Sequence, residues 1–303
     1  NNVFVSYAYY LGHGKTWAAN NSEAQMYIDG STISYNGNLW KNETTSYYWP
    51  KDGGSLTFFA YSYNKKDMTV GDNSGFACVW ALGEDGQYQG GITGHFDVAT
   101  NKNVDFLVAD IAADKTENEN SYAHTGVPTL FRHKLSMVNV AANLAEDYAN
   151  KKFILNSVKF TNLCHYATYS QIPEKMIPGG NMFLSDQVYA ENVGFEVKSG
   201  GLIAVPAEIK KGAGVEDGQY IYIPQEFNDD SYIVITYTVE TVVGNKVVKE
   251  ECTKPVKVKD VFPKWEMGHR YTFNLTFSLN EIHWDPAVEN WIDDEAGNIT
   301  IDR

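Results

Sequence analysis

Residues 271–279 alternate strictly between apolar and polar side chains, and this restricts the chain to folds that are built on β-sheets. The odd positions hold large apolar residues, and the even positions hold threonine, asparagine or serine. Successive side chains of a strand point to opposite faces, so the pattern predicts a strand with one buried and one hydrated face. Such a strand is typical of an antiparallel sandwich, in which each sheet packs on one side only. We expect the buried face to consist of Tyr271, Phe273, Leu275, Phe277 and Leu279.

Strand signals recur along the rest of the chain, whereas helical signals are sparse. The best helical window, Val138 to Tyr148, also fits a strand, and both interpretations stay open. Gly244-Asn245 separates two β-rich runs and predicts a hairpin turn. Asp29-Gly30 is predicted to be a turn between two short strands. The remaining predicted strands span residues 2–10, 25–28, 32–35, 39–40, 47–49, 55–63, 104–111, 153–163, 201–208, 219–224, 231–243 and 246–258.

A length of 303 residues is comfortable for two domains. The polar, turn-rich stretch 113–126 is predicted to connect them, because a new apolar core begins at Pro128. We therefore expect an N-terminal β-sandwich over residues 1–125 and a C-terminal β-sandwich over residues 126–303. Residues 164–194 are predicted to form a long irregular connection, which is usually functional or mobile.

The charge of the chain excludes two classes of partner. With 24 basic and 38 acidic residues the formal net charge is −14, which argues against nucleic acid and against anionic lipid surfaces. No apolar run is long enough to cross a membrane. Because the sequence starts at Asn1 without methionine and alternates as a strand at once, we expect that a leader has been removed.

Motifs that carry chemistry are incomplete in this sequence. The segment GHGKT at residues 12–16 lacks the first glycine of a phosphate loop, since Tyr9 stands there. The tail DDEAGN lacks the spacing of a calcium loop. His95 and His283 each lie two residues from an aspartate, but no nucleophile or second histidine at metal spacing accompanies them. We therefore predict no enzymatic activity, no cofactor and no metal site, and a structural hydrogen-bonding role for His133.

The three cysteines are far apart and form no CxxC motif, which excludes a zinc ribbon and a thioredoxin motif. Cys78 and Cys164 lie among apolar residues and are predicted to be small core residues.

Aromatic residues are abundant, and exposed ones could stack on the faces of sugars. The alternative is packing in strands and cores, because tyrosine is a favoured strand residue, and both interpretations stay open. The candidates for glycan stacking are Tyr47, Tyr48, Trp49, Tyr166 and Tyr169.

Several segments, taken together and in this order, resemble the fimbrillin family of Bacteroidales, the subunits of cell-surface fimbriae. They are FVSYAYY near the start, YYWPKDGGSLTFFAYS, DFLVA at 105–109, LFRHKLSMVNV, IYIPQ, and the W-x-x-G-x-x-Y block at 265–271 followed by Trp291. The resemblance implies two tandem transthyretin-like antiparallel β-sandwich domains. It also implies export as a lipid-anchored precursor, display at the outer membrane, and proteolytic removal of an N-terminal segment.

The resemblance further implies that the partners are other fimbrial subunits, joined by β-strand exchange. A sandwich that lacks a strand exposes unpaired N–H and C=O groups, and an incoming strand restores the ladder. The strand-exchange candidates are Val3, Val5 and Tyr7 at the start and Ile299 and Ile301 in the tail. The tail after Trp291 is short for a donor strand, which favours a tip or accessory subunit. A tip adhesin would also need a glycan or protein receptor on a host or bacterial surface. The alternative function is a non-polymerising, glycan-binding surface lipoprotein.

Overall fold

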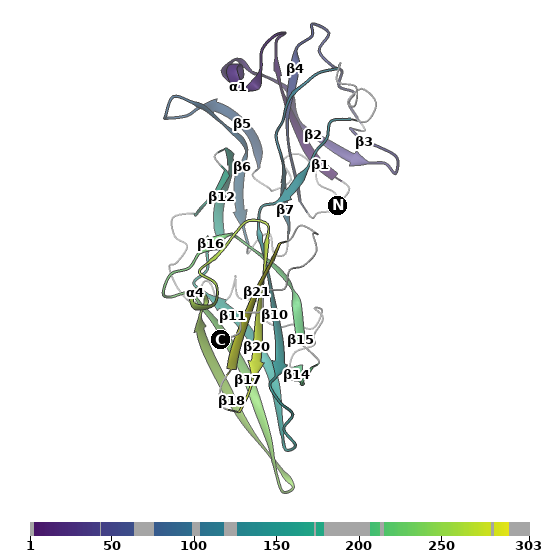
Figure 1. Ribbon diagram of the computed structural model, residues 1–303. Coiled ribbons are helices and arrows are strands. Elements are labelled where there is room, and N and C mark those ends of the chain that lie inside the picture. Colours follow the sequence, from purple (N-terminus) through teal and green to yellow (C-terminus); the bar gives the residue numbers. More distant parts are fainter. Residues whose placement is uncertain are drawn as a thin grey trace. The chain divides into compact units, whose positions relative to one another are not determined.

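The computed structural model describes residues 3–42, 44–63, 76–98, 104–117, 126–172, 174–178, 207–212, 215–279 and 282–290. Strands dominate this part of the chain (Figure 1). Its helices are each a single turn: α1 (Trp17–Asn20), η1 (Asn21–Glu23) and α4 (Val258–Val261). The prediction of an all-β protein is therefore confirmed.

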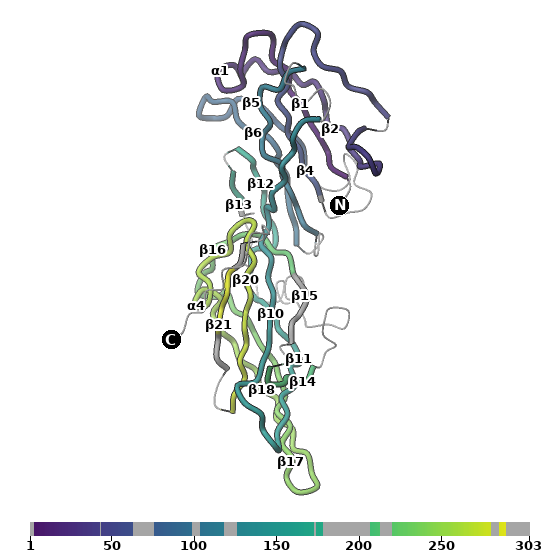
Figure 2. The backbone as a smooth tube through the Cα atoms, turned by 45° about the vertical axis from the view of Figure 1, so that its right-hand side comes forward, coloured from purple at the N-terminus to yellow at the C-terminus, as the bar shows by residue number. Residues whose placement is uncertain are grey.

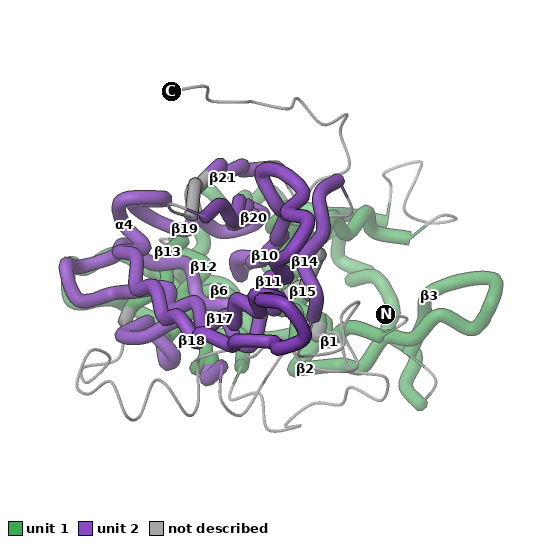
Figure 3. Tube along the Cα trace, turned by 90° about the horizontal axis from the view of Figure 1, so that it is seen from below, with its two compact units in different colours: residues 1–96, 104–134, 167–177 green, residues 97–103, 135–166, 178–303 purple. Residues whose placement is uncertain are grey.

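The chain forms two compact units, which are coloured separately in Figure 3. Unit 1 comprises residues 1–96, 104–134 and 167–177, and unit 2 comprises residues 97–103, 135–166 and 178–303. The predicted domain boundary at residue 125 lies outside the described residues. The division into two tandem sandwich domains at that position stays a prediction.

The larger sheet of unit 1 is antiparallel and has the strand order β3-β2-β1-β4-β7-β9, with β8 paired to β4. A second sheet has the order β13-β12-β6-β5. The bounds are β1 Val3–Leu11, β2 Gln25–Tyr35, β3 Trp40–Lys41, β4 Ser55–Tyr63, β5 Ala77–Leu82, β6 Tyr88–Asp97, β7 Phe106–Ala109, β8 Ala112–Lys115, β9 Phe131–His133, β12 Tyr166–Ile172 and β13 Glu174–Pro178.

The core of unit 1 is rich in aromatic rings. Phe59, Tyr61, Phe106 and Tyr169 are all buried. The Phe106 ring of β7 meets the Tyr169 ring of β12 edge-on at 5.5 Å, so the core joins the two sheets. The residues of β1 and β4 that alternate with these core positions point to the other face of the large sheet.

Unit 2 contains two four-stranded sheets, of order β15-β10-β20-β21 and β14-β11-β17-β18, and the short pair β16-β19. Strands β10 and β20 run parallel, which departs from the predicted antiparallel pattern. The bounds are β10 Ser136–Leu144, β11 Lys151–Thr161, β14 Ala207–Ile209, β15 Val215–Tyr222, β16 Gln225–Glu226, β17 Tyr232–Val243, β18 Lys246–Lys257, β19 Lys264–Trp265, β20 His269–Phe277 and β21 Ile282–Asn290.

The predicted inner face of residues 271–279 is confirmed at four of its five positions. Tyr271, Phe273, Leu275 and Phe277 are buried in the core of unit 2. The prediction that Leu279 is buried is wrong, because β20 ends at Phe277 and the Leu279 side chain beyond it is 51% exposed.

Among the other predictions, some are confirmed and some are wrong. The ambiguous window at 138–148 is strand as far as Leu144, where β10 ends, and Gly244 lies in the predicted hairpin turn with a φ of 60°. The prediction of a turn at Asp29-Gly30 is wrong, because both residues lie within strand β2, which pairs with β1 in an irregular register. Residues 47–49 are not a strand. The stretch 164–194 is not wholly irregular, since it contains β12 and β13.

The cysteines in the described residues are all free. Cys78 and Cys164 are buried, as predicted, and Cys252 is half-buried. Burial raises the pKa of the Cys78 thiol and of the Cys164 thiol to about 12. Both therefore stay protonated near neutral pH and behave as small apolar residues.

Candidate functional site

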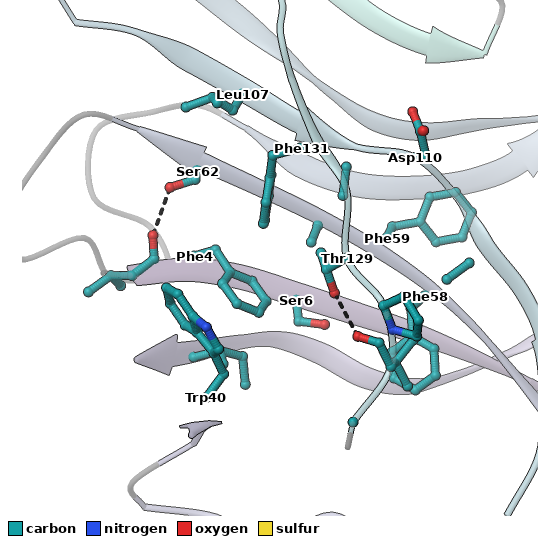
Figure 4. A pocket seen from close by; sticks show the side chains of 18 of the residues that line it. Phe4, Ser6, Trp40, Phe58, Phe59, Ser62, Leu107, Asp110, Thr129 and Phe131 are labelled. Atoms are coloured by element: carbon teal, nitrogen blue, oxygen red, sulfur yellow. Dashed lines mark hydrogen bonds between the residues drawn. The ribbon is translucent and has the colours of Figure 1, made fainter. Parts of the chain in front are cut away.

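The outer face of the large sheet in unit 1 is hollowed into a groove of about 1180 Å³, which we call the outer groove (Figure 4). Its floor comes from β1 and β4, where Phe4, Ser6, Phe58 and Ser62 lie on the face opposite the core. Its walls come from residues 38–40 before and in β3, and from residues 126–131 that lead into β9. Every lining residue belongs to unit 1.

Aromatic rings follow one another from the floor of the outer groove to the solvent. The Phe131 ring lies 5.3 Å from the Phe4 ring, edge to face, and Phe4 lies 5.4 Å from Trp40. Trp40 in turn lies 5.4 Å from Tyr35. Trp40 is 47% exposed, so a large part of this apolar surface is open to a partner. Tryptophan and tyrosine are enriched among the few residues that contribute most of the binding energy in protein interfaces.

The turn that carries Trp40 is held by local hydrogen bonds. The Asn36 side-chain oxygen accepts hydrogen bonds from the backbone N–H groups of Asn38 and Leu39, each at 3.1 Å. The Tyr35 hydroxyl donates to the Gly37 carbonyl at 3.0 Å. This Asx turn keeps Leu39 and Trp40 in place at the mouth of the groove before any partner arrives.

Charged groups at the outer groove are paired within the sheet. Arg132 donates hydrogen bonds of 2.8 Å to both oxygens of Asp110, and this bidentate contact lowers the pKa of the Asp110 carboxyl. His133 Nδ1 lies 2.8 Å from Asp105 Oδ2, so the predicted structural role of His133 agrees with its position. The lining contains two aspartates and no lysine or arginine. The groove therefore combines an apolar floor with acidic groups at its edge.

The N-terminal strand-exchange candidates belong to the sheet that forms this groove. β1 pairs with β2 along one edge and with β4 along the other, and Val5 and Tyr7 are buried in the core. Val3 lines the outer groove, and its carbonyl accepts a hydrogen bond of 2.7 Å from the Ser62 hydroxyl. In this structure β1 is thus an interior strand. The tail candidates Ile299 and Ile301 lie outside the described residues.

Two of the predicted glycan-stacking residues present open rings. Tyr48 is 73% exposed and Tyr47 is exposed beside it. Trp49 is half-buried, with its ring 6.1 Å from Phe58. The Tyr27 hydroxyl donates to the Tyr48 carbonyl at 2.7 Å and so fixes the backbone that presents these rings.

The other two predicted glycan-stacking residues are less accessible. Tyr166 is half-buried. Tyr169 is fully buried against Phe106, and its hydroxyl donates to Glu174 Oε1 at 3.0 Å. A buried ring has no face to offer a sugar, so Tyr169 is corrected to a core residue.

The described residues give no support to a metal site, because they contain no group of three or more His, Cys, Asp or Glu side chains placed to hold an ion. His95 Nδ1 lies 2.8 Å from the Thr168 hydroxyl, a contact that suits a structural role. None of the helices in the described part of the chain has the length and apolar composition of a membrane-spanning segment.

This fold is similar to that of known fimbrial and adhesion proteins. A search among curated proteins gave no match. A fimbrial protein from Bacteroides vulgatus superposes with a TM-score of 0.66 at 17% identity, over 95% of this chain and 92% of that one. A candidate cell adhesion protein from Bacteroides uniformis gives a TM-score of 0.54 at 14% identity, over 95% and 91% of the two chains. The fimbrillin-like family profile matches residues 14–291, which is most of the sequence, and the chain therefore belongs to the fimbrillin-like family.

Proposed function

We propose that this protein is a fimbrial subunit or adhesin of the cell surface, and that its outer groove receives an extended segment of another subunit. Membership of the fimbrillin-like family and likeness of fold to a fimbrial protein support the first part. The size of the outer groove supports the second part, that the groove receives an extended segment. Its volume of about 1180 Å³ exceeds the roughly 300–1,000 Å³ typical of sites for drug-sized ligands. A peptide segment suits such a groove better.

The edge of the sheet beside the groove favours an incoming strand. β9 ends the strand order, and β7 is its only strand partner among the described residues. A segment laid along the outer edge of β9 would extend the sheet by backbone pairing. Alternate side chains of that segment would then reach Phe4 and Phe131. We extend this to assembly by proteolysis-triggered strand exchange, with Val3, Val5, Tyr7, Ile299 and Ile301 as donor candidates.

The proposal includes export as a lipoprotein and anchoring of the precursor at the outer membrane. The acidic net charge of −14 is compatible with a surface protein that contacts other proteins and not nucleic acid. The proposed role is structural and not enzymatic, which membership of the fimbrillin-like family supports.

The test uses surface material sheared from the native host, analysed unboiled on SDS gels and probed for this chain. We expect a ladder of SDS-resistant oligomers. Trp40→Ala should weaken the ladder because it removes the exposed ring at the mouth of the groove. Tyr48→Ala is the matched control, since it removes an even more exposed ring that does not line the groove. A chain that is monomeric in unboiled samples and absent from sheared material would refute the proposal.

A second candidate function rests on the exposure of Tyr47 and Tyr48. Their rings, held by the Tyr27 hydrogen bond, could stack on a surface glycan in a lipoprotein that does not polymerise. This function predicts retention on a glycan array that Tyr48→Ala abolishes, together with monomers on unboiled gels. Retention that survives Tyr48→Ala would exclude these rings as the site.

A further inference from the structure

The longest hairpin of unit 2 ends in an apolar tip. Strands β17 and β18 pair from Tyr232↔Lys257 to Val243↔Lys246, and the turn is Gly244-Asn245. Four valines surround this turn, and each is 47–60% exposed: Val242, Val243, Val247 and Val248. Figures 1 and 2 show the end of the hairpin extending past the other strands of its unit. We call residues 242–248 the hairpin tip.

The hairpin tip extends beyond the strand that supports the rest of β17. The pairing of β11 with β17 stops at Lys151↔Thr241, and the last contact between the two segments is a hydrogen bond of 2.9 Å from Val242 N–H to the Asn150 carbonyl. Past this point β17 and β18 pair only with each other among the described strands. The packing of the described residues of unit 2 does not require valine there, because an exposed β-turn tolerates polar residues. Exposed apolar groups that gather in one place mark interaction sites.

The two faces of the tip are both apolar. Val242 and Val247 are opposite each other and share one face, while Val243 and Val248 lie on the other. A ribbon that is apolar on both faces is not fully covered by a flat surface. It needs a slot with a floor and a wall. The outer groove has this shape, with the sheet as floor and residues 126–131 as wall.

The backbone edges of the two surfaces also match, and charge does not oppose the contact. Lys246 is the only charged residue of the tip, and Lys249, which follows it, is paired with Glu240 of β17. The groove lining carries Asp105 and Asp110, which are already paired with His133 and Arg132, so these carboxylates do not repel the lysine of the tip. β18 ends the strand order of its sheet, as β9 does in unit 1. Two open strand edges can therefore pair while the valines meet the aromatic floor.

We propose that the hairpin tip of one copy docks in the outer groove of a second copy. This inference rests on the proposed function and names the hairpin tip, in place of the terminal donor candidates, as the segment that the outer groove receives. The contact joins two different surfaces of the same chain, so each bound copy leaves one free groove and one free tip. Such a heterologous contact continues into an open filament unless its rotation closes a ring.

The experiment is disulfide trapping between two tagged copies of the full chain, both with Cys252→Ser to remove the accessible native thiol. One copy carries Asn245→Cys at the tip and the other carries Leu39→Cys at the mouth of the groove. We expect a cross-linked heterodimer on mild oxidation. The matched control pairs Asn245→Cys with Leu82→Cys, an exposed leucine of β5 outside the groove lining, and should give no more than background.

Two further variants separate this inference from the proposed function. Val247→Asp on the tip copy should lower the yield of heterodimer about tenfold, as expected for a residue at the centre of an interface. It leaves the cores intact, because Val247 is exposed. If Val247→Asp leaves the SDS-resistant ladder unchanged while Trp40→Ala weakens it, the groove receives another segment and the hairpin inference is wrong. If neither variant affects assembly, the groove is not the contact. Equal trapping by Leu39→Cys and Leu82→Cys would also overturn the inference.

Discussion

Replacing Phe273 by alanine should test the assignment of the inner face of β20, the strand with the clearest sequence pattern. Phe273 is fully buried, at 0% exposure. Its ring lies 5.3 Å from Phe160, 5.0 Å from Phe262 and 6.4 Å from Trp265, so aromatic side chains enclose it from several elements. Truncation of an enclosed phenylalanine removes apolar contacts and leaves a cavity, at a cost of about 3–5 kcal/mol.

That loss is large compared with the roughly 5–15 kcal/mol that stabilises a typical domain. With an m-value of about 2 kcal/mol per molar urea, the unfolding midpoint of unit 2 should fall by about 2 M. The assay is urea unfolding followed by near-ultraviolet circular dichroism, which reports packed aromatic rings. Phe273→Asp should prevent cooperative folding of unit 2 altogether, because the core offers no partner for a charge.

Thr272→Ala is the matched control for this prediction. Thr272 directly precedes Phe273 on β20, and its half-buried side chain lies on the opposite face. Its replacement should change the free energy of unfolding by less than about 1 kcal/mol. A midpoint for Phe273→Ala within about 0.5 M of wild type, or a larger effect for Thr272→Ala, would refute the assignment of the inner face.

Two other predictions concern buried groups. In native protein near pH 7.5 only Cys252 should react with iodoacetamide, because burial keeps the other two thiols protonated with pKa values of about 12. Mass spectrometry should show one modification per native chain and none in Cys252→Ser, and a second native modification would contradict the burial. Glu174→Ala should destabilise unit 1 by about 1–3 kcal/mol, because the buried Lys134 ammonium loses its carboxylate partner. Adding Lys134→Met should recover part of that loss in thermal unfolding, since the Tyr169 hydroxyl still lacks its acceptor, and a double variant as unstable as Glu174→Ala would argue against the pair.

Local alternation predicted the strands that have one buried face. β4 was predicted with its bounds as observed, at Ser55–Tyr63, and the Gly244-Asn245 turn marked the β17-β18 hairpin. β21 was not predicted, since Asp285 and Pro286 interrupt its apolar pattern. Proline is tolerated there because β21 is an edge strand, paired with β20 alone among the described strands.

The outer groove could not be predicted from the sequence. Phe4, Trp40 and Phe131 come from three separate segments, and only the strand order brings their rings together. Each of them resembles an ordinary core residue in its local context. The consecutive Phe58 and Phe59 carried the one available signal, because a strand with large apolar residues on both faces has a use for each face. Alternation does not reveal which face is left uncovered.

The parallel pairing of β10 with β20 has a consequence for biosynthesis. Residues 137–144 lie beside residues 270–277, so a central seam of one sheet joins segments that emerge from the ribosome far apart in time. Until residues 270–277 have been synthesised, the apolar face of β10 stays exposed to solvent and prone to aggregation. A premature stop just before residue 269 would therefore remove an interior strand and not a dispensable end. The sheet of unit 2 can therefore be completed only after residue 277 has been synthesised.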